Sequence, residues 1–132
     1  MPTITVLGAA DDPRLVLVRD AVAFWNQTLG ELGSGFRLGV VARQQGSLPD
    51  DLIVALHDSS LNGRHPPFPE QLGPIPGDIV VALSEADFIS FSTHWPNGRG
   101  LVAIKSIHSY PLTLPNVARN VIACGATIKM RE

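Results

Sequence analysis

The sequence contains a single cysteine, Cys124, so no disulfide can form within the chain. Charged residues make up only 17% of the 132 residues, the formal net charge is −2, and lysine and arginine are not gathered into runs. We therefore expect no nucleic-acid partner, because nucleic acids bind to basic surfaces. No apolar run approaches the roughly 20 residues that cross a membrane. The start Met1-Pro2-Thr3 has no basic region typical of a signal peptide, so we expect no membrane partner and leave the localisation open.

Hydrophobic residues make up 45% of the chain, which is enough for one globular domain with its own core. Two segments have the pattern of helices. The first begins with Asp12 as N-cap and Pro13 at the first helical position, and it ends at Gly33. Its apolar residues recur at spacings of three and four: Leu15, Val18, Val22, Trp25, Leu29 and Leu32. The second helix begins at Pro115.

Five segments rich in β-branched or apolar residues predict strands: 3–8, 36–43, 51–57, 78–83 and 101–107. Segment 51–57 holds the continuous apolar run Leu-Ile-Val-Ala-Leu, which suits a strand covered on both faces. In segment 36–43, one face is predicted to carry Phe36, Leu38, Val40 and Ala42. Segment 84–100 is predicted to be a connection, with a helical turn begun by the capping pair Ser84 and Asp87.

This order of elements predicts an α+β fold. We expect a mixed, mostly parallel twisted sheet of about five strands, with two helices packed on one face. The strand that follows the first helix should lie parallel to the strand that precedes it.

Residues 114–123, with the sequence LPNVARNVIA, follow a predicted strand that ends at Ile107. They resemble the approach to the zinc-binding helix of metzincin metalloproteases, especially small bacterial matrixin-like ones. The first helix, with Phe24-Trp25-Asn26 at its middle, also resembles the first helix of that family. The resemblance implies a zincin N-terminal subdomain over 1–132, a single metzincin-like domain that is truncated or lacks the C-terminal subdomain. In an intact family member it implies zinc-dependent peptide hydrolysis.

The catalytic motif of that family, H-E-x-x-H-x-x-G-x-x-H, is absent from this sequence. In the motif two histidines one helical turn apart bind zinc, and the glutamate acts as general base on the metal-bound water. In an ungapped register their places are taken by Cys124, Gly125 and Ile128. Gly125 cannot accept a proton and Ile128 cannot bind a metal. Zinc is expected for intact family members, whereas for this chain we predict no catalytic residue, no cofactor and no metal site.

Only weak candidates for metal ligands remain: His57, His65, His94, His108 and Cys124. Matrixins hold a structural zinc in a loop comparable to the one predicted around His57 and His65, but the family's H-x-D spacing is missing here. We expect solvated loop histidines and surface turn residues. For Cys124 we expect a buried structural thiol on an apolar helix face rather than a nucleophile.

These observations favour a metalloprotease-like domain, related to zinc-dependent peptidases, that is inactive because its zinc-binding motif is missing. The alternative is a non-catalytic peptide- or protein-binding module that uses an exposed sheet edge, along which a peptide adds by backbone pairing. A third interpretation is an unrelated small α/β protein with an enzymatic role of its own.

The last helix also predicts association. In an intact family member a C-terminal subdomain would cover its apolar residues Val121, Ile122, Ile128 and Met130. Without that cover, we expect a homodimer that uses the last helix or an exposed sheet edge.

Overall fold

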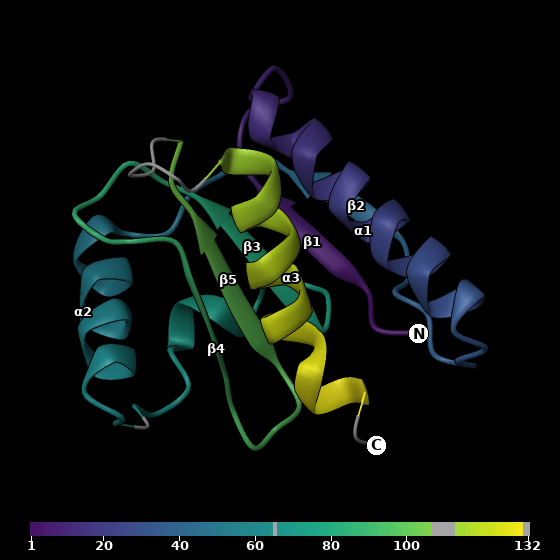
Figure 1. Ribbon diagram of the computed structural model, residues 1–132. Coiled ribbons are helices and arrows are strands. Elements are labelled where there is room, and N and C mark those ends of the chain that lie inside the picture. Colours follow the sequence, from purple (N-terminus) through teal and green to yellow (C-terminus); the bar gives the residue numbers. More distant parts are fainter. Residues whose placement is uncertain (65, 107–112, 131–132) are drawn as a thin grey trace.

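The structure is a computed structural model that describes residues 1–64, 66–106 and 113–130. Figure 1 shows its elements in chain order: β1 (Ile4–Leu7), α1 (Pro13–Glu31), β2 (Val41–Gln44), α2 (Asp50–Leu61), the 3₁₀ helix η1 (Glu70–Leu72), β3 (Ile79–Leu83), β4 (Phe91–His94), β5 (Gly100–Ile104) and α3 (Leu114–Met130).

The strands form one five-stranded sheet in the order β2-β1-β3-β5-β4. β1 pairs in parallel with β2 and β3, β3 pairs in parallel with β5, and β4 runs antiparallel to β5. The predicted mixed, mostly parallel sheet is therefore confirmed. The parallel pairing of the two strands joined through the first helix is confirmed as well.

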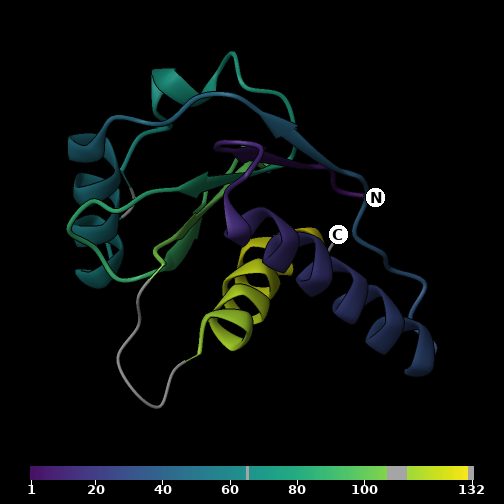
Figure 2. The same cartoon turned by 90° about the horizontal axis from the view of Figure 1, so that it is seen from above.

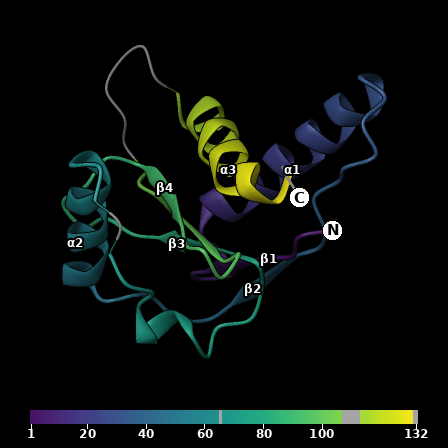
Figure 3. The same ribbon diagram turned by 90° about the horizontal axis from the view of Figure 1, so that it is seen from below.

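Helices cover both faces of the sheet, as Figure 3 shows. α1 and α3 lie side by side on one face (Figure 2). Leu15 of α1 and Ile122 of α3 belong to the same hydrophobic core there. α2 and η1 lie on the other face, where Ile53 and Leu72 pack in a second core with residues of β3 and β5. Two helices therefore share one face, as predicted. The predicted total of two is not confirmed, because α2 is a third helix.

Helix α1 begins and ends where the sequence predicts. Asp12 is its N-cap, and the side chain accepts a hydrogen bond from the backbone N–H of Arg14 at 2.9 Å. The chain leaves the helix through Gly33, whose φ of 76° is readily adopted only by glycine. The first three members of the predicted apolar stripe are buried, but its last member, Leu32, is 77% exposed beyond the end of the helix.

Helix α3 is held against both α1 and the sheet. The indole N–H of Trp25 in α1 donates to the carbonyl of Arg119 at 2.9 Å. Gly125 allows a close approach to β5, because a Cβ atom added there would lie 2.7 Å from a methyl carbon of Val102. Such a distance is too short for two carbon atoms, so the glycine sets how near the helix lies to the sheet.

The burial of α3 changes the basis for the predicted homodimer. Val121 and Ile122 are 8% and 0% exposed, so the expectation that they lack cover is wrong: α1 and the sheet already cover them. The side chains of Ile128 and Met130 lie outside the described residues. The homodimer, through the last helix or an exposed sheet edge, stays a prediction.

Residues 51–57, predicted to be a strand, belong to helix α2. Asp50 and Asp51 lie in its first turn, where carboxylates interact favourably with the helix dipole. Only one side of the apolar run is buried: Ile53 and Leu56 face the core, whereas Ala55 is exposed. A five-residue apolar run is compatible with a strand or a helix, and its flanking residues decide between them.

Strand β2 begins at Val41, later than predicted. Asn26 of α1 holds the segment before it: the side-chain amide donates to the carbonyl of Leu38 at 3.0 Å, and its oxygen accepts from the N–H of Leu38 at 2.7 Å. These bonds occupy backbone groups that a strand would use for pairing. The predicted common face is also wrong, because Leu38 is buried and Val40 is 74% exposed.

Strand β4 lies in the segment that was predicted to be a connection. Its residues Ser92, Thr93 and His94 are polar, so the alternation by which strands are recognised is weak. The predicted helical turn is absent from the described segment 84–90, where the hydroxyl of Ser84 instead accepts from the N–H of Ala86 at 3.1 Å. The expected number of five strands is reached because β4 takes the place of the strand predicted at 51–57.

Candidate functional site

Strand β4 is an edge of the sheet. Among the described strands it pairs only with β5, in a register that sets Thr93 opposite Leu101 and His94 opposite Gly100. Next to this ladder, the N–H of Trp95 donates to the carbonyl of Arg99 at 2.9 Å. Residues of an antiparallel strand alternate between pointing their backbone groups toward the partner and away from it.

This alternation assigns the backbone groups of β4. Because Trp95 points its N–H toward the partner, Thr93 and Phe91 do so as well, and Ser92 and His94 point theirs away from β5. The N–H and C=O groups of Ser92 and His94 are therefore directed to the open side of the sheet, where they can pair with an added strand.

A cavity of about 320 Å³ follows this edge. Its walls come from the end of α2, from β4 and from α3, and it is lined by Ser60, Gly63, Arg64, Ser92, Thr93, His94 and Cys124. We call this cavity the edge groove. Because α2 and α3 lie on opposite faces of the sheet, the groove has one wall on each face, with the edge of β4 between them.

A second cavity, of about 510 Å³, shares the lining residue His94 with the first. We call it the aromatic pocket, and it is lined by Pro66, Pro67, Phe68, His94, Trp95, Pro96 and Asn97. The indole N–H of Trp95 donates to the carbonyl of Pro66 at 3.1 Å, and its ring meets Phe68 edge-on at 5.2 Å between centroids. These contacts hold the walls of the pocket in place without a ligand.

Arg64 gives the edge groove its charge. It is exposed in the segment that follows α2, and no ion pair joins it to another residue within the described ranges. Neither cavity has an aspartate or glutamate among the described residues that line it. The described lining of the groove is thus positively charged, whereas the net charge of the chain is −2.

His57 is not a surface loop residue as expected, because it lies within α2 and is only 7% exposed. Its Nδ1 lies 3.1 Å from a carboxylate oxygen of Asp58, and its Nε2 accepts the N–H of Ile89 at 3.3 Å. The ring also contacts Phe88 and Phe91 edge-on. Both ring nitrogens are used within the protein, so His57 anchors the segment before β4 and is not free to bind a metal.

Cys124 is exposed, so the predicted buried thiol is wrong. The reason is the neighbouring Gly125, which faces β5: successive residues of a helix turn by about 100°, and Cys124 is thereby directed toward the edge of the sheet. Cys124 and the exposed His94 line the same groove, whereas His57 does not. His65 and His108 lie outside the described residues.

The described side chains offer no metal centre. In this part of the chain no three histidine, cysteine, aspartate or glutamate residues are placed to hold an ion together. At Gly125, the position of the metzincin glutamate in the ungapped register, the space that a side chain would need is occupied by Val102.

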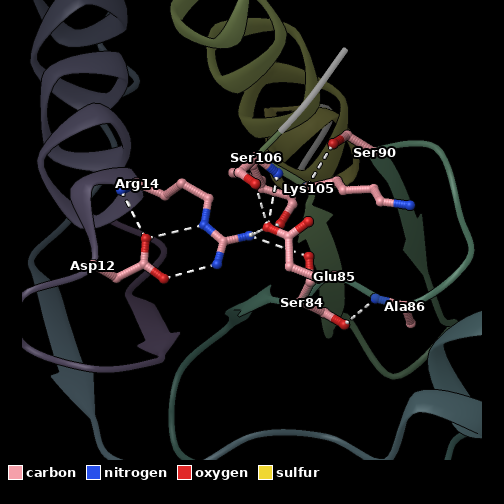
Figure 4. Close-up of polar contacts among 9 residues, drawn as sticks. Asp12, Arg14, Ser84, Glu85, Ala86, Ser90, Lys105 and Ser106 are labelled. Carbon is pink, nitrogen blue, oxygen red and sulfur yellow. Dashed lines mark hydrogen bonds and ion pairs between the residues drawn. The ribbon is translucent and has the colours of Figure 1, made fainter.

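A separate polar cluster lies where β3 and β5 end and α1 begins (Figure 4). Arg14 is 8% exposed, and its guanidinium contacts Asp12 at 2.7 Å, Glu85 at 3.1 Å and the carbonyl of Ile104 at 2.8 Å. The hydrogen bond from Arg14 lowers the pKa of Asp12 below its usual value, against desolvation, which raises it. These bonds engage Arg14 with the protein itself, so the cluster joins α1 to the sheet.

Of the residues that line the edge groove, the sequence singled out only His94 and Cys124, and the others were missed. A signal for β4 was present, because Phe91, Thr93 and Trp95 are strand-forming residues at a spacing of two, before the turn that contains Gly98. No local signal marks Arg64, because its place beside β4 depends on α2 packing against the sheet.

No family model, curated protein or solved structure matches this chain. None of the helices in the described part of the chain is long and apolar enough to cross a membrane.

Proposed function

We propose that this protein binds an extended peptide segment, which adds as a strand to the open edge of β4. The observation that carries the proposal is the outward direction of the backbone groups of Ser92 and His94 along a groove with walls on both faces. Main-chain pairing supplies affinity in this mode of recognition, and cavities for alternate side chains supply specificity.

We also propose that the domain is a metalloprotease-like scaffold without peptidase chemistry. The resemblance of residues 114–123 motivates the scaffold, and two observations support the lack of peptidase chemistry. Gly125 packs where the glutamate of the motif would stand, with no room for a side chain, and Cys124 is exposed in the groove at the position of the first histidine. A scaffold that retains a peptide groove but lacks a general base would bind a peptide and leave it uncut.

The test of peptide binding uses a phage-displayed library of random eight-residue peptides, selected on the purified protein. Enriched sequences are synthesised with a fluorescein label, and their affinity is measured by fluorescence anisotropy. Ser92→Pro removes one outward N–H of β4 and leaves the pairing with β5 in place, because proline is tolerated on the open side of an edge strand. Ser92→Ala is the matched control, since it changes the side chain and keeps the N–H.

We expect wild-type protein and Ser92→Ala to bind the enriched peptides alike. Ser92→Pro should weaken binding on the order of tenfold or more, because it loses a backbone hydrogen bond and places a ring in the path of the added strand. Thermal unfolding of each variant checks that the fold is retained. Absence of enrichment, or equal binding by folded Ser92→Pro, would overturn the proposal.

A further inference from the structure

We infer that the peptide bound at β4 carries an acidic side chain that faces Arg64 and an apolar side chain that enters the aromatic pocket. This inference rests on the proposed function and names the class of peptide for the same groove. It follows from the side chains that an added strand would point toward the α2 face, and from what the protein presents at two places along that face.

An added strand continues the pleat of β4, so its side chains alternate between the two faces of the sheet. Phe91 packs in the core on the α2 face, so Phe91 and Thr93 face α2, whereas Ser92 and His94 face the side of α3. Half of the peptide's side chains therefore meet the wall of the groove formed by Ser60 and Arg64.

That wall selects by charge. Arg64 is exposed, no described residue forms an ion pair with it, and the described lining of the groove contains no carboxylate that would compete. A guanidinium group matches a carboxylate in charge and in the spacing of its donors. A lysine or arginine of the peptide at the same place would be repelled.

The second feature lies at the end of β4. There lies the aromatic pocket, which shares His94 with the edge groove and whose walls include the rings of Phe68 and Trp95 and the prolines Pro66 and Pro67. Trp95 is 4% exposed and its N–H is already bonded to the carbonyl of Pro66, so the pocket offers mainly apolar surface. An apolar side chain of the peptide is the occupant that such a surface stabilises.

The experiment repeats the eight-residue library selection on three proteins: wild type, Arg64→Glu and Arg19→Glu. Arg19 is exposed on α1 and does not line the groove, so Arg19→Glu changes the net charge equally and serves as the matched control. A wild-type selected peptide is also synthesised with its acidic residue changed to lysine, and separately with its apolar residue changed to serine.

We expect wild type and Arg19→Glu to enrich peptides with aspartate or glutamate, and Arg64→Glu to enrich peptides with lysine or arginine. Arg64→Glu should bind the acidic peptide on the order of fivefold to tenfold more weakly. This difference should shrink as sodium chloride is raised, because salt screens exposed charges. The serine variant of the peptide should bind at least several-fold more weakly than its parent to all three proteins.

The outcomes separate this inference from the proposed function. If peptides bind and folded Ser92→Pro abolishes binding, but Arg64→Glu selects the same peptides as wild type, the acidic preference is wrong and edge binding stands. If the serine variant binds as its parent does, the role of the aromatic pocket is wrong. If no peptide is enriched on wild type, both the proposed function and this inference fail.

Discussion

At the scale of single residues, Gly125 determines how closely α3 approaches the sheet. Replacing it with alanine places a methyl group against Val102, where a Cβ would lie 2.7 Å from the nearest methyl carbon. We predict that Gly125→Ala destabilises the fold by about 1–2 kcal/mol, because overpacking costs about 1–3 kcal/mol and the gain in helix propensity is at most about 1. Urea unfolding measures the change.

A second helical glycine provides the control. An added Cβ at Gly30 would meet only the end of the flexible Arg37 side chain, at 3.0 Å. Gly30→Ala should therefore be neutral or slightly stabilising. Equal effects of the two substitutions would contradict the role assigned to Gly125.

The lowered pKa of Asp12 should make the free energy of unfolding depend on pH. Its pKa is lowered in the folded protein by the hydrogen bond from Arg14, so its contribution to stability is present above the unfolded value of 3.8 and is lost as pH falls through the folded value. Asp12→Asn keeps an N-capping side chain and loses the charge. We predict that it destabilises the protein by about 1–2 kcal/mol at pH 7, and that the difference from wild type closes below pH 3.8. Unfolding curves measured from pH 7 to pH 2 would show a constant difference if Asp12 made no such contact.

At the scale of elements, His57 connects α2 to the segment that precedes β4. It accepts the N–H of Ile89 and packs against two aromatic rings. We predict that His57→Ala destabilises the fold by about 2–4 kcal/mol, since it leaves a cavity and an unsatisfied N–H. The amide of Ile89 should also exchange faster with deuterium. Asp58→Asn alters an exposed partner of the same ring and should cost less than about 1 kcal/mol, so similar losses in the two variants would refute this account.

An element can be predicted from the sequence when its own residues mark its type and its ends. Local signals are sufficient for α1, because Asp12, Pro13 and Gly33 mark both of its ends. For α2, the apolar run favoured a strand, although the acidic pair at its start is typical of a helix. That the run is buried on one side alone can be seen only in the packed molecule. For β4, the polar residues of an edge strand conceal the strand from a reading based on hydrophobic alternation.

The candidate site was less predictable than the fold. Cys124 was a named candidate, yet its exposure depends on which side of α3 faces the sheet, and Gly125 decides that. Arg64 and Thr93 are 29 residues apart in the numbering of the chain and meet only because α2 packs beside β4. Such a site depends on tertiary packing, which the local pattern of a single sequence does not encode.

At the scale of the whole molecule, the proposed scaffold can be tested by measuring bound metal. We predict that the purified protein holds no stoichiometric zinc and cleaves no casein in a chelator-sensitive manner, because the described residues offer no group of three ligands. Elemental analysis and a casein assay with and without chelator measure both. Tight one-to-one zinc binding would contradict the prediction and direct attention to His65 and His108.

The most direct test of peptide addition to β4 is amide hydrogen exchange, measured residue by residue by NMR with and without a selected peptide. The N–H groups of Ser92 and His94 point to the open edge, and that of Thr93 points to β5. We predict that the peptide slows exchange at Ser92 and His94, while Thr93, already bonded within the sheet, changes little. Unchanged exchange at Ser92 and His94 under saturating peptide would contradict the account.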